Sequence, residues 1–274
     1  MNLNYLSFSK MMISIEIPVT HGKYLRQVLE SIRNQSYQDY EVIVVSSGRK
    51  ELSDIVKEFG FKVIEKEAKL LHARYIAHME SKGEYTLILD ETRMLEKDTL
   101  KTLSSLDYDM IIIGEKEIGE SFWVKLAQLD KDNILYCNPI DPLNGIALPR
   151  YFKSEILSKA FSSAKEKLGE KFYEVVFWDH AIIFYEASKI SNKIYVINDP
   201  LISHFGDSSL LDIVRKYYRY GKTAKVLKNT HYSDFLARKR VGRRICKGSF
   251  WERRSLYLLY LARGIPYLLG YYLG

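Results

Sequence analysis

Apolar and polar positions follow two spacings in turn along residues 13–113. Residues 13–18 alternate apolar and polar side chains up to a proline, which predicts a strand. Residues 24–32 place apolar side chains at helical spacing, and 41–45 hold a β-branched run typical of a strand buried on both faces. The same order predicts helices over 52–59, 70–81 and 98–106, and strands over 62–64, 85–89 and 109–113. Alternating strands and helices predict a mostly parallel sheet with helices on both faces.

The strand ends mark where a ligand is expected. In open α/β sheets, ligands bind outside the carboxyl ends of the strands. Here those ends are residues 18–21, 46–48 and 90–93.

The rest of the chain is less regular. Residues 114–149 are predicted to be irregular, with turns at Asn138-Pro and 141–145. Later elements are predicted as a helix over 151–167, a helix after Trp178-Asp179-His180, a strand over 194–197 and a basic aromatic helix over 213–227. The strongly basic stretch 238–254 then leads to the nearly apolar segment 255–274.

Charge separates this last part from the rest. The chain carries a net charge of +7, yet residues 207–274 alone hold 15 basic and 4 acidic residues. Such asymmetry predicts an anionic partner: membrane lipid, nucleic acid or a phosphorylated substrate. No recognised nucleic-acid motif accompanies the basic residues, so no nucleic acid is expected.

The apolar segment 255–274 is long enough to cross a bilayer. Its tyrosines, Arg263 and Pro266 favour instead a helix lying in or dipping into the cytoplasmic leaflet, held by an anionic membrane surface. The alternative is a helix that packs on its own domain or on a second subunit, which would give a homodimer.

The chain has two cysteines, Cys137 and Cys246, far apart in sequence. They are expected to be reduced thiols of a cytosolic protein. Residues 1–10 lack the basic start and apolar run of a signal peptide, so the domain is predicted to face the cytoplasm.

Several of these segments together resemble a known family. Residues 15–18, 24–37, 41–48, 73–90 and 177–180 are similar, in this order, to the inverting family 2 glycosyltransferases of the GT-A fold. The resemblance covers roughly residues 13–225. Together with composition and charge, it predicts an N-terminal extension over 1–10, a GT-A catalytic domain over 11–206 and a basic C-terminal helical region over 207–274. The implied activity is transfer of a sugar from a nucleotide-sugar donor to an acceptor.

Inverting sugar transfer needs a base that takes the acceptor's proton. Asp179 matches the family's catalytic base, and Trp178 stands where a glutamate usually precedes it. Burial against Trp178 would exclude water and raise the pKa of the carboxylate. The alternative is that Asp179 caps the helix that follows.

Asp90 matches the first carboxylate of the family's Asp-x-Asp motif, which holds Mg²⁺ or Mn²⁺ between the donor's two phosphates. Thr92 replaces the second carboxylate, so either Glu91 turns inward, Thr92 binds metal through water, or the site is weak. His204 matches a position that supplies a further metal ligand in some GT-A enzymes, and a structural histidine is the alternative. Arg93 is another source of positive charge for the leaving group.

Arg74 resembles the family arginine that approaches the nucleotide, and a guanidinium grips phosphate through two bonds. Ser46 and Ser47 stand where the family has acidic residues, one of which contacts uracil; the missing charge disfavours a uridine donor and leaves guanosine or thymidine donors open. The complete donor-binding set implied by the resemblance is Pro18, Thr20, His21, Ser46, Arg74, Asp90 and Glu91.

The function expected is therefore inverting glycosyl transfer to a hydroxyl or phosphate of a lipid-linked or glycan acceptor, at the cytoplasmic membrane face, in polysaccharide or glycolipid biosynthesis. The alternative is a non-catalytic GT-A-like protein that binds nucleotide-sugar or another protein. The incomplete Asp-x-Asp motif and the serines at 46–47 favour that alternative.

Overall fold

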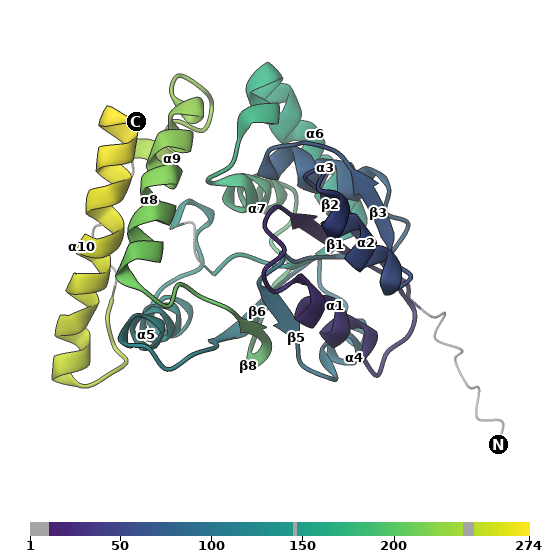
Figure 1. Cartoon of the computed structure of the whole chain (residues 1–274), viewed down its shortest axis with the longest axis horizontal. Coiled ribbons are helices and arrows are strands. Elements are labelled where there is room, and N and C mark those ends of the chain that lie inside the picture. The colour runs from purple at the N-terminus through teal and green to yellow at the C-terminus, as the bar shows by residue number, and fades with distance from the viewer. Residues whose placement is uncertain (1–10, 145–146, 238–243) are drawn as a thin grey trace.

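The computed structural model describes residues 11–144, 147–237 and 244–274 and contains one eight-stranded sheet (Figure 1). The strand order is β3-β2-β1-β4-β7-β6-β8-β5. The strands are β1 (Ile13–Val19), β2 (Tyr40–Ser46), β3 (Lys62–Glu65), β4 (Tyr85–Ile88), β5 (Arg93–Leu95), β6 (Met110–Glu117), β7 (Tyr151–Lys153) and β8 (Ile194–His204). β1 pairs in parallel with β2 and β4, and β2 with β3, as the sequence predicts. β7 lies antiparallel between β4 and β6, and β5 pairs antiparallel with β8 at the far edge.

Helices cover both faces of the sheet. Apolar side chains of α1 (Leu25–Arg33), α2 (Lys50–Glu58) and α4 (Thr99–Ser104) pack with Ile13, Ile15 and Ile17 of β1 on one face. On the other face, α3 (Leu70–Met79), α6 (Ser154–Leu168) and α7 (Asp179–Ile190) pack against Ile88, Met110 and Phe152. Each face of the sheet buries one apolar cluster shared by strands and helices. This burial gives each element the apolar spacing that is visible in the sequence.

The C-terminal helices form a third layer at the end of the molecule opposite β3 (Figure 1). α8 (Leu210–Ala224) and α10 (Phe250–Leu273) run side by side, and α10 also contacts α5 (Phe122–Cys137). The short α9 (Asp234–Ala237) and the 3-10 turns η1 (Pro142–Asn144), η2 (Gly169–Glu174) and η3 (Lys225–Leu227) complete the described elements. The predicted division of the chain at residue 206 stays a prediction. Residues 1–10 and part of the predicted basic stretch lie outside the described residues.

A helix lies where the sequence pattern predicts none. α5 occupies much of the segment 114–149, and the Ser121 hydroxyl caps it by accepting a hydrogen bond from the Val124 amide at 3.2 Å. Its buried face mixes apolar residues with Asp130 and Asn133, which hides the helical period. The helix predicted over 151–167 begins at Ser154, because residues 151–153 pair as strand β7.

The two cysteines are not free thiols. Cys137, at the end of α5, and Cys246, shortly before α10, form a disulfide bond. The expectation of reduced thiols is therefore wrong in this structure, because folding brings the two residues to a Cα–Cα distance of 5.9 Å, within reach of a bridge. Among the described residues, no helix is long and apolar enough to cross a membrane.

Candidate functional site

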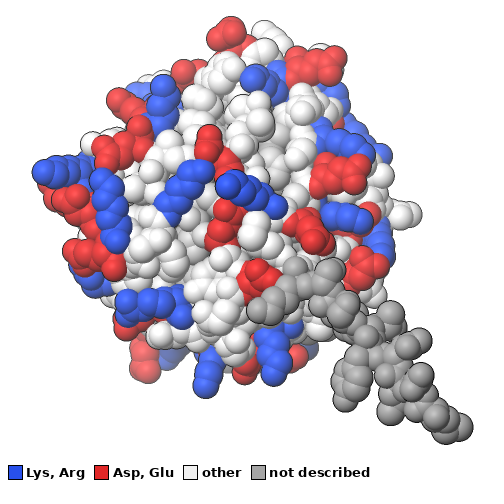
Figure 2. Space-filling view, turned by 90° about the vertical axis from the view of Figure 1, so that its right-hand side faces the viewer, with Lys and Arg blue, Asp and Glu red and all other residues white. Residues whose placement is uncertain are grey.

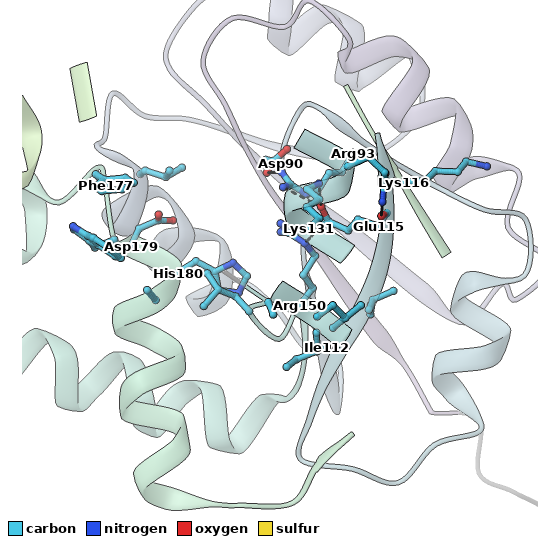
Figure 3. Close-up of a pocket in the computed structure, with 18 of the residues that line it drawn as sticks. Asp90, Arg93, Ile112, Glu115, Lys116, Lys131, Arg150, Phe177, Asp179 and His180 are labelled. Carbon is cyan, nitrogen blue, oxygen red and sulfur yellow. Dashed lines mark hydrogen bonds and ion pairs between the residues drawn. The ribbon is translucent and has the colours of Figure 1, made fainter. Parts of the chain in front are cut away.

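A cavity of about 430 Å³ opens at the carboxyl ends of the central strands (Figure 3). Asp90 and Arg93 line it at the end of β4 and the start of β5, and Glu115 lines it from β6. Asp179 faces the same space from the first turn of α7, on the opposite side in the close-up (Figure 3). The described lining holds six basic side chains, Arg74, Arg93, Lys116, Lys131, Arg150 and Lys216, and four acidic ones, Asp90, Glu115, Asp132 and Asp179. Such a cavity suits an anionic ligand.

Asp179 is held by an arginine of a different helix. Its Oδ2 accepts a hydrogen bond from Nε of Arg74 at 2.6 Å, and both side chains are buried. Nη1 of Arg74 also donates to the Leu89 carbonyl at 2.9 Å, directly before Asp90. The structure thus brings two predicted site residues together and links them to the end of β4.

The helix cap at this point is not made by the Asp179 side chain. Trp178 holds the N-cap position, in a left-handed conformation with φ of 75°, and Asp179 is the first helical residue. Left-handed backbone is costly for a bulky residue and is often found at functional sites. Phe177 stacks on Tyr220 of α8 at 4.5 Å, so aromatic rings border the carboxylate and limit water.

Asp90 is bonded through both carboxylate oxygens. Oδ1 accepts from the Thr92 hydroxyl at 2.5 Å and from the Thr92 amide at 3.1 Å, while Oδ2 forms an ion pair with Arg93. Burial alone would raise the pKa of Asp90, but the guanidinium groups of Arg93 and Arg150 outweigh burial and lower that pKa. Asp90 is therefore ionised and already paired.

The two arginines share a second carboxylate. Nε of Arg93 donates to Oε1 of Glu115 at 2.9 Å, and Nε of Arg150 forms an ion pair with the same oxygen. Lys131 of α5 bonds the other oxygen of Glu115 at 2.7 Å and Oε1 of Glu117 at 2.6 Å. Arg93, Arg150, Lys131, Glu115 and Asp90 form one network, the Asp90 charge network (Figure 3).

The predicted metal ligands Asp90, Thr92 and His204 do not fit a cation in this arrangement. The Thr92 hydroxyl is used on Asp90, and Nδ1 of His204 lies 2.9 Å from Oε1 of Glu117. A metal ion at Asp90 would meet the Arg93 guanidinium, which repels it. No group of three or more histidine, cysteine, aspartate or glutamate residues that could hold a metal ion occurs within the described ranges.

Glu91 does not turn toward the cavity lining as a metal ligand would. Its carboxylate accepts hydrogen bonds from the backbone amides of Thr20 at 3.3 Å and His21 at 3.0 Å, and from the amide of Gly22. Glu91 therefore holds the loop after β1, which carries Thr20 and His21 of the predicted donor-binding set.

The other predicted donor-binding residues lie beside that loop rather than in the cavity lining. Pro18 pairs with Val45 inside the sheet. Ser46 ends β2, and its hydroxyl is buried without a hydrogen-bond partner among the described residues. Arg49, which the pattern did not single out, donates to the Thr20 carbonyl at 3.0 Å.

Sequence reasoning also missed Arg150, Glu115 and Lys131. They come from 114–150, where no motif marks them, and only the pairing of β6 with β7 and β8 and the position of α5 bring them to Asp90. In sequence, these three charged residues cannot be told apart from charged residues on an exposed surface.

Comparison with known proteins agrees with this fold. Residues 14–104 match the model of the family Glycosyl transferase family 2. "Glycosyltransferase GlyG" of Streptococcus pneumoniae serotype 4 (strain ATCC BAA-334 / TIGR4) is 28% identical over 124 residues, which are 40% of this chain and 41% of that protein. The chain thus spans less than half the length of this curated relative.

Solved structures share the fold at low identity. S. aureus TarS 1-349 in complex with UDP-GlcNAc has a TM-score of 0.54 and 15% identity, over 95% of this chain and 81% of that chain. Mannosyltransferase PcManGT from Pyrobaculum calidifontis, in complex with GDP-Man and Mn2+, has a TM-score of 0.54 and 13% identity, over 96% of this chain and 74% of that one.

The mixed sheet, its flanking helices and the cavity at the strand ends define an α/β protein of the GT-A glycosyltransferase fold. Within this fold, the likeness to the family Glycosyl transferase family 2 covers residues 14–104, less than half of the chain.

Proposed function

We propose that this chain is an inverting glycosyltransferase that uses a nucleotide-sugar donor. One observation carries the proposal: Asp179 and the Asp90 charge network face the same cavity from opposite sides (Figure 3). An inverting transfer needs a base on the acceptor side and positive charge on the side of the departing diphosphate. The TarS complex with UDP-GlcNAc, of the same fold, supports a nucleotide-sugar as donor.

Each residue has a role in the proposed reaction. The acceptor oxygen forms a bond to the anomeric carbon of the sugar, while the bond from that carbon to the diphosphate oxygen breaks and its electron pair leaves with the nucleotide. Asp179 takes the acceptor's proton, and Arg74 fixes the position of the Asp179 carboxylate. Phe177, Trp178 and Tyr220 limit the access of water to the carboxylate. The sugar is therefore transferred to the acceptor rather than to water.

Calorimetry with UDP-, GDP- and dTDP-sugars tests the donor site, in buffers with Mn²⁺ and with EDTA. We expect one nucleotide to bind clearly more tightly than the others. If none of these sugars binds in either buffer, the enzyme proposal fails. Binding without turnover on any glycan or lipid-linked acceptor would favour the non-catalytic alternative.

We further propose that the acceptor is lipid-linked and that α10 holds the protein on an anionic membrane surface at its cytoplasmic face. One side of α10 packs on α5 and α8 through Leu256 and Leu259. The other side exposes apolar residues three and four positions apart, and each is more than half exposed: Tyr257, Leu258, Leu261, Ile265, Leu268 and Tyr272. Arg253 and Arg254 lie in its first turns. An apolar stripe next to basic residues is typical of helices that lie in the interface of a membrane.

Charge elsewhere on the surface differs. The face that carries α2 and β3 shows acidic and basic side chains interspersed (Figure 2). Among the described residues, Arg219 and Lys222 of α8 and Arg253 and Arg254 of α10 are the basic side chains that favour an anionic surface on the α10 side. The disulfide does not favour the proposed cytoplasmic location, because such bonds are typical of oxidising compartments.

Flotation with phosphatidylserine vesicles tests the membrane proposal. A variant with Leu261→Gln, Ile265→Gln and Leu268→Gln should lose flotation, while Met79→Gln, an equally exposed apolar residue on α3, should float like the parent. Flotation unchanged by the triple variant contradicts the proposal. A dimer that dissociates in the triple variant, measured by light scattering, would show that a second copy covers the stripe.

A further inference from the structure

The Asp90 charge network places two guanidinium groups where a metal ion is expected. Arg93 bonds Asp90 through Nη1 and Glu115 through Nε, and Arg150 bonds Glu115 through Nε and approaches the Ile88 carbonyl at 3.4 Å through Nη1. The side chains of Arg93, Arg150 and Glu115 are each close to nine-tenths buried, yet all three line the cavity. The charges are thus fixed in place and still open to a ligand.

We propose that Arg93 and Arg150 take the place of a divalent cation at the diphosphate of the nucleotide-sugar donor, so that this chain binds its donor without metal. The inference rests on the proposed function and concerns how the same site holds its substrate.

The chemistry of arginine supports the replacement of a divalent cation by Arg93 and Arg150. Two guanidinium groups supply the same formal charge as one divalent cation, and arginine stays charged at any physiological pH. Each guanidinium carries five N–H donors in a planar fork that matches phosphate oxygens. The bonds to Asp90, Glu115 and the Ile88 carbonyl use only some of these donors within the described part of the chain.

The carboxylates in the network have a different task from metal ligands. Asp90 and Glu115 hold the arginine side chains in one orientation, which reduces the entropy lost when phosphate binds. Lys131 neutralises the second oxygen of Glu115. The sequence agrees with this role of the carboxylates. Thr92 and Arg93 follow Asp90-Glu91, where a metal site would need a second carboxylate.

Nucleotide binding in the presence and absence of metal tests the proposal on the full chain. The probes are UDP, GDP and dTDP, titrated calorimetrically in EDTA and in MnCl₂. We expect the dissociation constant of the nucleotide that binds to change by less than about threefold between the two buffers. In addition, the electron paramagnetic resonance signal of free Mn²⁺ should not decrease when protein is added without nucleotide.

The outcomes separate this inference from the proposed function. A nucleotide that binds in MnCl₂ but not in EDTA overturns the inference and leaves the glycosyltransferase proposal standing. Loss of the free Mn²⁺ signal on addition of protein alone also overturns the inference. If no nucleotide or nucleotide-sugar binds in either buffer, both proposals fail.

Charge-conserving variants test the two arginines directly. Arg93→Lys and Arg150→Lys keep the charge that pairs with Asp90 and Glu115 but lose the planar fork, so the proteins should fold and bind nucleotide at least tenfold more weakly in EDTA. Arg26→Lys is the matched control, because Arg26 forms an exposed ion pair with Glu58 far from the cavity lining. Nucleotide binding that is unchanged in both cavity variants, with circular dichroism like the parent, overturns the inference.

Discussion

Arg74 and Asp179 form a buried ion pair that joins helix α3 to the first turn of α7, with 2.6 Å between Nε and Oδ2. The same guanidinium reaches the Leu89 carbonyl, next to Asp90. The orientation of the proposed base is therefore coupled to the strand end that carries the proposed diphosphate site. One arginine thus links the proposed base to the end of strand β4.

Replacing the proposed base should remove turnover and spare donor binding. Asp179→Asn keeps the shape and still accepts a hydrogen bond from Arg74, but it no longer takes a proton. We expect kcat to fall by about 10²–10⁴ and the donor dissociation constant to change by less than about threefold. The rate of nucleoside diphosphate release measures kcat, and calorimetry measures the donor dissociation constant.

Asp107→Asn is the matched control, because Asp107 is exposed and pairs with Lys193 at the opposite end of the strands. Its turnover should equal that of the parent. Turnover retained in Asp179→Asn would remove this residue as the base and return it to a structural role at the start of α7.

The parallel half of the sheet was predictable because it depends on local pattern. β1 alternates apolar and polar residues, β2 and β4 are mainly apolar, and all three lie between amphipathic helices, which favours parallel pairing through crossover connections. β5 and β7 are three residues each and are held by pairing with distant strands. No local period marks elements of that length, so the sequence did not predict them.

The candidate site was predictable where residues sit at a strand or helix end or match the family resemblance. Asp90 follows the end of β4, Asp179 begins α7, and Arg74, inside α3, was expected from the resemblance; the structure places all three on the cavity. Glu115, Lys131 and Arg150 were missed because their role arises from the tertiary contacts of β6 and α5. Glu91 was expected in the donor-binding set, with a metal ligand as one alternative, and its hydrogen bonds to the backbone amides of residues 20–22 could not be predicted from sequence.

The Glu91 carboxylate should control the order of the loop after β1. In Glu91→Gln the charge that accepts three backbone amides is lost, which should cost about 1–2 kcal/mol and loosen residues 20–22. Hydrogen exchange read by mass spectrometry should show faster exchange in that peptide alone. Glu58→Gln, which removes only an exposed ion pair with Arg26, is the control. Equal exchange in both variants would contradict the role given to Glu91.

The contact between α8 and α10 should depend on a glycine at their closest approach. A Cβ atom at Gly270 would lie 2.0 Å from the Tyr218 carbonyl oxygen, so Gly270→Ala must separate the helices. We expect it to destabilise the protein by about 1–3 kcal/mol, measured as a lower melting temperature, and to weaken nucleotide binding because α8 carries Tyr217 and Tyr220 into the cavity.

Gly264 provides the matched control in the same helix. A Cβ atom there meets nothing within 4 Å, so Gly264→Ala should raise stability by up to about 1 kcal/mol through helix propensity. If both alanine variants raise the melting temperature, α8 and α10 do not pack as closely as the structure shows.

Acid should destabilise the protein through His204 in a defined pH range. Burial, followed by the charges of Arg93 and Lys131, lowers the pKa of His204 to about 4 from an ordinary value of 6.5. Between these values the unfolded chain binds a proton at His204 that the folded chain does not, so stability falls as the pH falls from 6.5 to 4. Burial alone would raise the pKa of Glu117, but His204 and Lys131 lower that pKa to about 2. Protonation of Glu117 therefore costs the folded protein further stability as the pH falls below 4.5.

Melting temperatures between pH 7 and pH 4 measure this dependence. His204→Gln keeps a side-chain donor toward Glu117 but cannot titrate, so its melting temperature should fall less steeply over that range than that of the parent. His180, whose pKa is lowered well below its usual value by burial and by Arg150, contributes with the same sign, so part of the slope should persist. The exposed His231 supplies the control His231→Gln, which should retain the slope of the parent. A His204→Gln slope equal to that of the parent would show that His204 binds its proton equally in the folded and unfolded chains.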